Sequence, residues 1–575
     1  MINAFKKRIQ TAKTEIPADL VLRNAQVVNV FLGTIQEKDV AVYDGVIVGV
    51  GRGYRGTKET DLTGKFIVPG LIDGHLHIES SMLTPSHLAA ALVAHGTTTV
   101  VADPHEIANV MGLDGIRFML EDSDAIPFDF FFMAPSCVPA THLETAGATL
   151  NAADLSALKD HQRILGLAEM MNFPGVLMGE EDTLEKIILF RDKILDGHCP
   201  SLTHYDLQAY LTAGIRSDHE TTDLSEALEK LENGMMLMIR EGTTAKNLEA
   251  LLPIINDRNA RRLCFVSDDL HAEDIQQSGH LDMILRKAVR LGLDPLTAVQ
   301  LVTLNPAEYF GLKDRGAVAP GYNADLVVLD NLERFNVNSV YKNGVLVMDS
   351  GKQVNFSVPE KASYFRPRPL NMRPLTAGDL SIAHSGGKAR IIETVPGQIL
   401  TRLVIEEIKS DNGFVVSDVK ADILKICVVE RYEAGARTGK GLVRGFGLKR
   451  GAMASSVAHD SHNVIAVGVS DKEMIAAIEA VRLMGGGLVV ASEGEIPVKV
   501  PLEIGGLMST HSIVKLVQQL EKVKQAAVQM GCLAEEPFMA LSFLALPVVP
   551  ELKLTDRGLV DVNRFEIVPL FVDPG

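Results

Sequence analysis

A chain of 575 residues is longer than one ordinary domain, and its 46% hydrophobic and 22% charged residues are the balance of a soluble globular protein. The 73 acidic residues exceed the 56 basic ones, and the resulting net charge of −17 disfavours nucleic acid as a partner because such a surface repels phosphates. Five scattered cysteines without a C-x-x-C pair indicate a reducing compartment, and no apolar run approaches the roughly 20 residues of a membrane span. We therefore expect a cytoplasmic protein that binds neither nucleic acid nor a membrane.

The two flanks of the first 358 residues share the pattern of a small β domain. Short β-rich runs alternate with glycine turns, which predicts an antiparallel sheet. These runs lie at 18–22, 38–42, 46–50, 324–329 and 339–345. The economical interpretation is one composite β domain, built from residues 1–68 and 312–358 on either side of an insertion.

The insertion, residues 69–311, has the rhythm of parallel βα units. Thr84-Pro85 predicts the start of a helix that Gly96 closes, and Asp294-Pro295 predicts the start of the last one. Eight strands are predicted, with ends near His77, Asp103, Pro135, Glu169, His198, His219, Arg240 and Asp268. Eight parallel strands favour a closed α/β barrel, a (β/α)8 TIM-like fold, whose active site lies at the carboxyl ends of the strands.

A third domain is predicted from about Pro359 to the end of the chain. A proline-rich stretch, Arg366 to Pro369, separates the two parts, and an α/β pattern follows it. We place an additional α/β domain at 359–575.

Ionisable residues gather at the predicted strand ends. His75 and His77 are two apart on a strand, so both side chains leave the same face and can share one metal. Carboxylates or imidazoles end four further strands, at Glu169, His198, His219 and Asp268. Each has an ordinary alternative, such as a helix cap, a turn cap or a hydrogen bond to a loop. Because all six lie at equivalent positions, a metal site is the better interpretation.

The chemistry of this set predicts hydrolysis. Four imidazoles and two carboxylates without a thiolate suit divalent manganese, iron or zinc. A carboxylate shared by two metals would make the site binuclear, and even one bound metal lowers the pKa of water to about 7. Asp268 could accept a proton from a metal-bridged hydroxide and pass it to a leaving group. These residues do not name the substrate.

The pattern resembles the amidohydrolase superfamily. The opening signature is Pro69 to His77, and the closing one runs from Asn305-Pro306-Ala307 through Gly316 to Val327. The strand-four position holds Glu169, where most binuclear members carry a modified lysine. The resemblance then narrows to the bacterial adenine deaminase family, through blocks at 77–83, 103–110, 133–139, 168–175, 217–220, 240–242, 459–463 and 505–509.

The resemblance implies a metal-dependent hydrolase that converts adenine to hypoxanthine and ammonia in purine salvage. It implies manganese as the first expectation, with iron or zinc as alternatives, and it implies a homo-oligomer, with a dimer favoured. The implied metal ligands are His75, His77, Glu169, His198, His219 and Asp268, and Asp268 also transfers the proton.

Further residues are assigned less directly. Glu241 and Glu79 are the candidates for protonating the purine ring, and the alternative for Glu241 is a salt bridge with a neighbouring arginine such as Arg240. A substrate-binding role is expected for Asp103, His105, Glu106 and Arg240, the first three of which could instead contact metal or support the metal-binding histidines. The segment His459 to Asn463 could reach over the barrel as a lid, form another metal site, or be a hydrogen-bonded turn before the strand at 464–467.

Two other functions fit the same pattern. A related hydrolase would open a cyclic amide or a similar heterocycle, although Glu169 and the third domain argue against it. A scaffold protein would keep the barrel without catalysis, and it need not hold close to two metals per chain.

Overall fold

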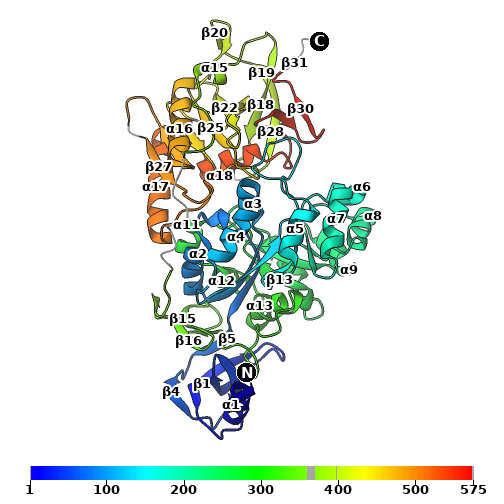
Figure 1. Cartoon of the computed structure of the whole chain (residues 1–575), viewed down its shortest axis with the longest axis vertical. Helices are drawn as coiled ribbons and strands as arrows, with labels where there is room; N and C mark the ends of the chain where they lie inside the picture. Colours follow the sequence, from blue (N-terminus) through cyan, green and yellow to red (C-terminus); the bar gives the residue numbers. More distant parts are fainter. Residues whose placement is uncertain (1, 359–368, 397, 496, 573–575) are drawn as a thin grey trace.

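The computed structural model describes residues 2–358, 369–396, 398–495 and 497–572. A sheet formed near the N-terminus lies at one end of the molecule, a barrel lies in the middle, and the C-terminal segment covers the other end (Figure 1). The predicted boundary at Pro359 and the proline-rich residues 366–368 lie outside the described residues. The predicted domain limits at 68, 311 and 358 stay a prediction.

Eight short parallel strands build the barrel. They are β6 (Leu71–Leu76), β7 (Thr97–Ala102), β8 (Asp129–Ala134), β9 (Ile164–Met170), β10 (Ile194–Gly197), β11 (Ser217–Asp218), β12 (Met236–Arg240) and β13 (Leu263–Val266). Their pairing runs from β6 to β10 and from β11 to β13. The Arg216 N–H donates to Leu195 O between β10 and β11, and the Asp268 N–H donates to His75 O between β13 and β6. These bonds close the ring, which confirms the predicted (β/α)8 barrel.

Side chains of the barrel strands alternate between two cores, as the period of two requires. On β13, Leu263 and Phe265 pack outward against the helices, whereas Cys264 and Val266 fill the barrel interior. Met236 and Met238 of β12 also point inward. The same alternation, continued by two residues beyond Met238 and Val266, places the side chains of residues 240 and 268 at the barrel mouth.

Helices surround the barrel, and two of them, α2 and α13, begin at the predicted signals. The Asp294 side chain accepts from the Thr297 N–H, with Pro295 in the first turn of α13, and Pro85 opens α2. The helices are α2 (Pro85–Leu92), α3 (His105–Met111), α4 (Leu113–Asp122), α5 (Ala152–Lys159), α6 (Phe173–Met178), α7 (Glu181–Phe190), α8 (His204–Thr212), α9 (Leu224–Glu232), α10 (Leu248–Leu251), α11 (Ala272–Ser278), α12 (Leu281–Arg290), α13 (Pro295–Leu301) and α14 (Leu304–Tyr309).

The flanking β-rich runs form one sheet, as expected. Helix α1 (Ile2–Ala12) precedes it, and its strands are β1 (Ala18–Asn29), β2 (Thr34–Tyr43), β3 (Val46–Gly51), β4 (Gly56–Asp61), β5 (Phe66–Pro69), β14 (Leu326–Leu329), β15 (Val337–Lys342), β16 (Val345–Asp349) and β17 (Lys352–Gln353). The expectation of a purely antiparallel sheet was wrong, because β4 and β5 both pair parallel to β1. Strand β5 leads directly into β6, so this sheet lies at the amino ends of the barrel strands.

The C-terminal segment is organised around a second nine-stranded sheet. Its strands are β18 (Lys388–Thr394), β19 (Thr401–Glu407), β22 (Ile423–Val429), β23 (Thr438–Arg444), β24 (Ala452–Ser455), β25 (Val464–Gly468), β26 (Gly487–Ala491), β27 (Val498–Pro501) and β31 (Phe571–Val572). The remaining elements are α15 (Ala377–Leu380), β20 (Ser410–Asp411), β21 (Phe414–Val415), α16 (Asp471–Met484), α17 (Ile513–Gln529), α18 (Pro537–Ser542), β28 (Leu552–Thr555), β29 (Gly558–Asp561) and β30 (Glu566–Val568).

The C-terminal segment packs on the barrel mouth. The Ser509 N–H donates to Met82 O at 2.8 Å, and Asn463 Nδ2 donates to Thr145 O at 2.8 Å. Both barrel residues follow the carboxyl ends of strands. The end of the barrel at which sites form is therefore covered by a second domain.

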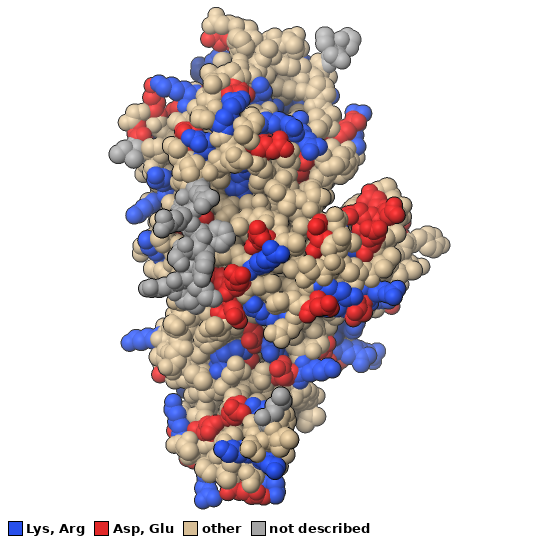
Figure 2. Space-filling model, in the orientation of Figure 1, with Lys and Arg blue, Asp and Glu red and all other residues tan. Residues whose placement is uncertain are grey.

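Positive and negative side chains are interspersed over much of the visible face (Figure 2). Acidic residues gather on the lobe that carries α6 and α7, where Glu180, Glu181 and Asp182 are exposed. In the described part of the chain, no helix combines the length and apolarity needed to cross a membrane.

Candidate metal centre and active site

Imidazoles and carboxylates from separate strands meet in the barrel mouth. Nε2 of His77 lies 3.3 Å from Oε1 of Glu169 and 3.3 Å from Oδ1 of Asp268. Nε2 of His75 lies 3.6 Å from the same Asp268 oxygen, and the ring of His75 stacks on that of His219 at 4.0 Å. These five side chains are buried. The closed barrel thus brings together groups that are far apart in sequence.

Glu169 divides these donors into two groups. Its Oε1 faces His77, whereas its Oε2 lies 2.6 Å from Nδ1 of His198 and 3.2 Å from Nε2 of His219. Burial alone would raise the pKa of this carboxyl, but the surrounding imidazoles, His219 first, hold it well below its usual range. A carboxylate with one oxygen toward each group is suited to bridge two cations.

His77 has the tautomer that metal binding requires. Nδ1 of His77 is 3.2 Å from the Asp103 carbonyl, which can only accept, so this nitrogen carries the proton and Nε2 keeps its lone pair. Nε2 of His75 is buried without a hydrogen-bond partner. A buried nitrogen left unpaired beside two carboxylates fits a cation ligand, and imidazole with carboxylate suits divalent transition metals.

Asp268 is held in the mouth by its backbone and by an arginine. It has a left-handed backbone conformation, with φ 56°, and its Oδ2 accepts from Nη1 of Arg240 at 2.7 Å. Burial would raise the pKa of Asp268, but the charge of Arg240 and the imidazoles of His75 and His77 hold it well below its usual range. The guanidinium also binds Glu220 in a bidentate pair. Arg240, expected to bind substrate, has its contacts with these two carboxylates.

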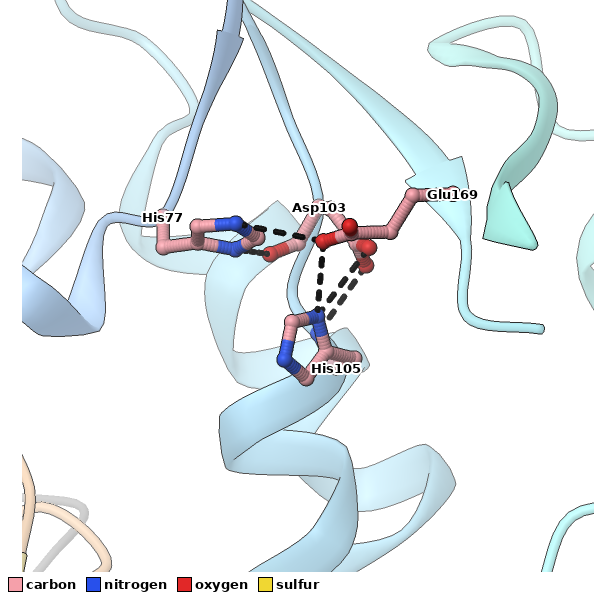
Figure 3. Close-up of side chains that lie close together, drawn as sticks. All are labelled: His77, Asp103, His105 and Glu169. Carbon is pink, nitrogen blue, oxygen red and sulfur yellow. Dashed lines mark hydrogen bonds and ion pairs between the residues drawn. The ribbon is translucent and has the colours of Figure 1, made fainter. Parts of the chain in front are cut away.

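Asp103 and His105 lie directly beside the centre. Figure 3 shows His77 and Glu169 pointing toward each other, with His105 approaching Glu169 from the first turn of α3. Nδ1 of His105 lies 3.1 Å from Oδ2 of Asp103 and 3.7 Å from Oε1 of Glu169. Asp103 thus contacts two histidines, one through its carbonyl and one through its carboxylate.

The two candidates for ring protonation have different surroundings. Oε1 of Glu79 accepts from the Ile107 N–H at 2.9 Å, while its buried Oε2 has no hydrogen-bond partner. Burial, followed by the nearby charge of Glu106, raises the pKa of Glu79 to about 7. Glu241 instead pairs with Lys287 and accepts from the Leu248 N–H. Glu241 therefore forms a salt bridge, as the alternative expected, but its partner is Lys287 and not an arginine.

Glu106 contacts the C-terminal domain. Its Oε1 lies 2.9 Å from Nδ1 of His459, and its Oε2 lies 3.2 Å from Nε2 of His462. Segment 459–463 is buried throughout and is followed by β25. The segment thus reaches the barrel mouth, where a lid or another metal site would lie. It is also the expected hydrogen-bonded turn before β25, because the His462 N–H donates to Ala458 O at 2.7 Å.

A cavity lies between the mouth and the C-terminal domain. Acidic residues line its barrel side, and mainly apolar side chains of α17 and α18 line the other. The barrel contributes Glu79, Ser80, Met82, Glu106, Asp269, His271 and Glu273, and the C-terminal domain contributes Val457, His459, Leu488, Leu520, Val523, Lys524, Glu536, Phe538, Met539 and Ser542.

Two residues of the centre were not singled out from the sequence. Glu220 lies 3.6 Å from both His198 and His219, and its sequence signals are its place next to His219 and within the family block 217–220. Asp73 accepts from the backbone N–H groups of His75 and Ser267 and lies 3.0 Å from Nε2 of His280. Through these two backbone hydrogen bonds, Asp73 links the end of β6, which carries His75, to the segment after β13, which carries Asp268.

Comparison with known proteins gives matches along nearly the whole chain. Residues 66–347 match the model of the amidohydrolase family, and residues 398–566 match that of the adenine deaminase C-terminal domain. The adenine deaminase of Desulfatibacillum aliphaticivorans is 50% identical over 98% of this chain and 99% of its own length. That of Oceanobacillus iheyensis is 46% identical over 100% of this chain and 99% of its own.

Among solved structures, a beta-aspartyl dipeptidase from Fervidobacterium islandicum AW-1 is 18% identical, with a TM-score of 0.46, and covers 59% of this chain and 99% of its own. The two full-length relatives share both matched regions with this chain at about half identity. The chain belongs to the adenine deaminase family of the amidohydrolases.

Proposed function

We propose that this protein is an adenine deaminase, which hydrolyses adenine to hypoxanthine and ammonia. The observation that carries the proposal is the placement of Glu169 between two groups of donors, with one oxygen toward His77 and the other toward His198 and His219. We assign the metal-ligand role to the set named from the sequence, which is His75, His77, Glu169, His198, His219 and Asp268. The extent of the similarity to adenine deaminases supports the choice of substrate.

Two divalent cations held by these residues would lower the pKa of a shared water molecule, to about 7 for one metal alone, and so supply a nucleophile at neutral pH. Asp268 takes a proton from the water that attacks C6 of the purine. The same carboxyl then gives this proton to the amino group, whose bond to C6 breaks to release ammonia. The proton left on the new C6 oxygen returns to the acid that protonated the ring, and the C6 carbonyl of hypoxanthine forms. Arg240 keeps Asp268 ionised and oriented for the first of these transfers.

We assign protonation of the ring nitrogen to Glu79. Within the described residues its Oε2 has no hydrogen-bond partner, and the residue lines the cavity, whereas both oxygens of Glu241 already have partners. A proton delivered to the ring prevents negative charge from accumulating there when water adds to C6. Asp103 and His105 orient the imidazole of His77 and the carboxylate of Glu169.

The finer parts of the proposal are manganese as the native metal, a place in purine salvage, the cytoplasm as compartment and a homodimer as assembly. Five free and buried cysteines support a reducing compartment. Imidazole with carboxylate accepts manganese, iron and zinc, so only metal analysis separates these three.

The test is an adenine assay on chelated, manganese-loaded and iron-loaded protein, with metal counted per chain. We expect ammonia and hypoxanthine from the loaded samples, close to two metals per chain, and little turnover after chelation. Hydantoin is the comparison substrate. Ring opening of hydantoin with inert adenine would replace the proposal by a cyclic amidohydrolase, and loaded protein inert toward both would indicate a scaffold.

A further inference from the structure

A loop of the C-terminal domain presents His459 to the cavity beside the metal centre. The loop precedes β25, and His459, Asp460 and His462 are all buried in it. The cavity that His459 lines also contains Glu79 and Asp269, the close sequence neighbours of His77 and Asp268. A side chain from outside the barrel thus lies where a substrate of the centre would bind.

Glu106 is fully occupied by this loop. One oxygen contacts Nδ1 of His459 at 2.9 Å and the other contacts Nε2 of His462 at 3.2 Å. Burial would raise the pKa of Glu106, but the charge of His459 lowers it well below its usual range. An ionised carboxylate with both oxygens engaged orients its partners, and it has no free oxygen directed to a ligand.

A third metal bound by Glu106, His459 and His462 is disfavoured by the tautomer of His462. The Ala458 N–H donates to Nδ1 of His462 at 3.2 Å, so in the neutral ring the proton lies on Nε2, the atom that faces Glu106. Burial also lowers the pKa of His462 to about 4, which keeps this ring neutral. The three residues therefore form a network of close contacts in which Nε2 of His462, which carries the proton, has no lone pair for a cation.

The same network fixes the ring of His459. Nδ1 donates to Glu106, and one face stacks on Phe543 with 4.6 Å between centroids and an angle of 16° between planes. Within the described residues, Nε2 has no hydrogen-bond partner, and it is not among the buried unpaired atoms, so it is open to the cavity. Burial opposes the charge, but Glu106 raises the pKa of His459 to about 9. The result is a rigid cationic N–H donor.

The cavity matches a flat heterocycle with acceptor nitrogens. Leu488, Val523, Phe538 and Met539 provide apolar contact from the C-terminal domain, and the fixed donor lies among them. Resting on the proposed function, we propose that His459 is a substrate-binding residue whose Nε2–H donates a hydrogen bond to ring nitrogen N3 or N7 of the purine. Glu106 is then a positioning residue that acts through His459, and the C-terminal domain completes the active site.

A matched pair of variants tests this assignment. His459→Asn keeps a donor near the position of Nδ1, and so keeps Glu106 paired, but it removes the donor at Nε2. His459→Gln places its amide near Nε2 instead. We expect His459→Asn to lose about 10- to 100-fold in kcat/KM for adenine, as for a lost hydrogen bond to a charged group, with two metals still bound. His459→Gln should recover part of this loss.

The ligand atom is tested with 3-deazaadenine and 7-deazaadenine as inhibitors. Wild-type protein should bind one of them about tenfold or more weakly than adenine, because its N–H donor loses its acceptor. In His459→Asn the difference in affinity between adenine and this analogue should disappear. A purely structural role of His459 would weaken all three ligands by one common factor.

Three results would overturn the inference. The first is unchanged kcat/KM in His459→Asn, and the second is unchanged discrimination between adenine and both analogues in that variant. The third needs no variant: equal binding of adenine and both analogues to wild-type protein. If wild-type protein still deaminates adenine in these cases, the proposed function stands and only the role of His459 is lost. Loaded wild-type protein inert toward adenine would overturn both.

Discussion

At the scale of single residues, the centre depends on how each carboxylate is partnered. Glu169 faces imidazoles with both oxygens, and Asp268 faces imidazoles with one oxygen and Arg240 with the other. The first arrangement suits a bridge between two cations, whereas the second suits the proton transfer that we propose for Asp268. Residues of one chemical type thus receive different roles from their neighbours.

Asp268→Asn should separate metal binding from turnover. The amide keeps an oxygen for the cation and for Arg240 but cannot accept the water proton. We expect the variant to retain much of its metal and to lose about 10²- to 10⁴-fold in kcat. Asp282→Asn is the matched control, because Asp282 is also buried and paired with an arginine, Arg286, away from the centre. Near-normal turnover of Asp268→Asn would remove it from proton transfer.

Glu79→Gln and Glu241→Gln should distinguish the two candidate acids. Glu79 has a free buried oxygen at the cavity, and Glu241 is bound to Lys287 and the Leu248 N–H. We expect Glu79→Gln to lose about 10²- to 10⁴-fold in kcat, measured with metal-loaded protein, and Glu241→Gln to remain close to wild type. The reverse ranking would transfer the role to Glu241.

At the scale of elements, the loops after β10 and β11 carry His198 and His219, and one buried lysine joins them. Nζ of Lys230, on α9, donates to Cys199 O at 2.7 Å and to Oδ2 of Asp218 at 3.0 Å. The other Asp218 oxygen accepts from the Cys199 N–H at 2.8 Å. Lys230 thus joins the two loops from behind His198 and His219 and, in the described residues, does not contact these two side chains.

Lys230→Met should therefore weaken the metal centre. Loss of such a supporting partner typically costs about 10- to 100-fold in metal affinity, and a competition titration with a chelator would measure it. Lys342→Met is the control, since Lys342 is equally buried and binds Asp129 and Asp325 at the opposite end of the barrel. Both variants should unfold at lower temperature. Equal metal affinity in the two would contradict a specific role of Lys230.

At the scale of the whole molecule, one buried charge makes stability depend on pH. Lys553, on β28, is fully buried, donates to Ile399 O and Phe543 O, and has no carboxylate partner among the described residues. Burial lowers its pKa to about 7, far below that of an unfolded lysine. Between these two values the unfolded chain holds a proton that the folded chain has lost, so this lysine makes the protein more stable as pH rises.

Lys553→Met should remove that dependence. Thermal unfolding of wild type and variant at pH 7 and pH 9 measures it, and the melting temperature of wild type should rise relative to that of the variant at the higher pH. The slope is at most about 1.4 kcal/mol per pH unit for one proton. A constant difference between the two proteins would show that Lys553 keeps its proton when folded.

Much of the fold and of the candidate site follows from local patterns. Periodicity and turn residues predicted each barrel strand to within a few residues, because parallel strands of one barrel share the same sequence rhythm. The carboxyl ends of parallel barrel strands meet at one end of the barrel. His75, Glu169 and Asp268 could therefore be assigned to one site before their contacts were known. The direction of β4 and β5 was missed, since alternation is the same in parallel and antiparallel strands.

What the sequence alone determined is therefore the set of groups at the barrel mouth. Only the tertiary structure decided their partners: Arg240 with Asp268 and Glu220, Glu241 with Lys287, and Glu106 with His459. These pairings depend on rotamers and on how a second domain packs against the barrel, and neither leaves a periodic signal. The chemical type of a side chain is written in the sequence. The role of each carboxylate depends in addition on the charged groups that the fold places beside it.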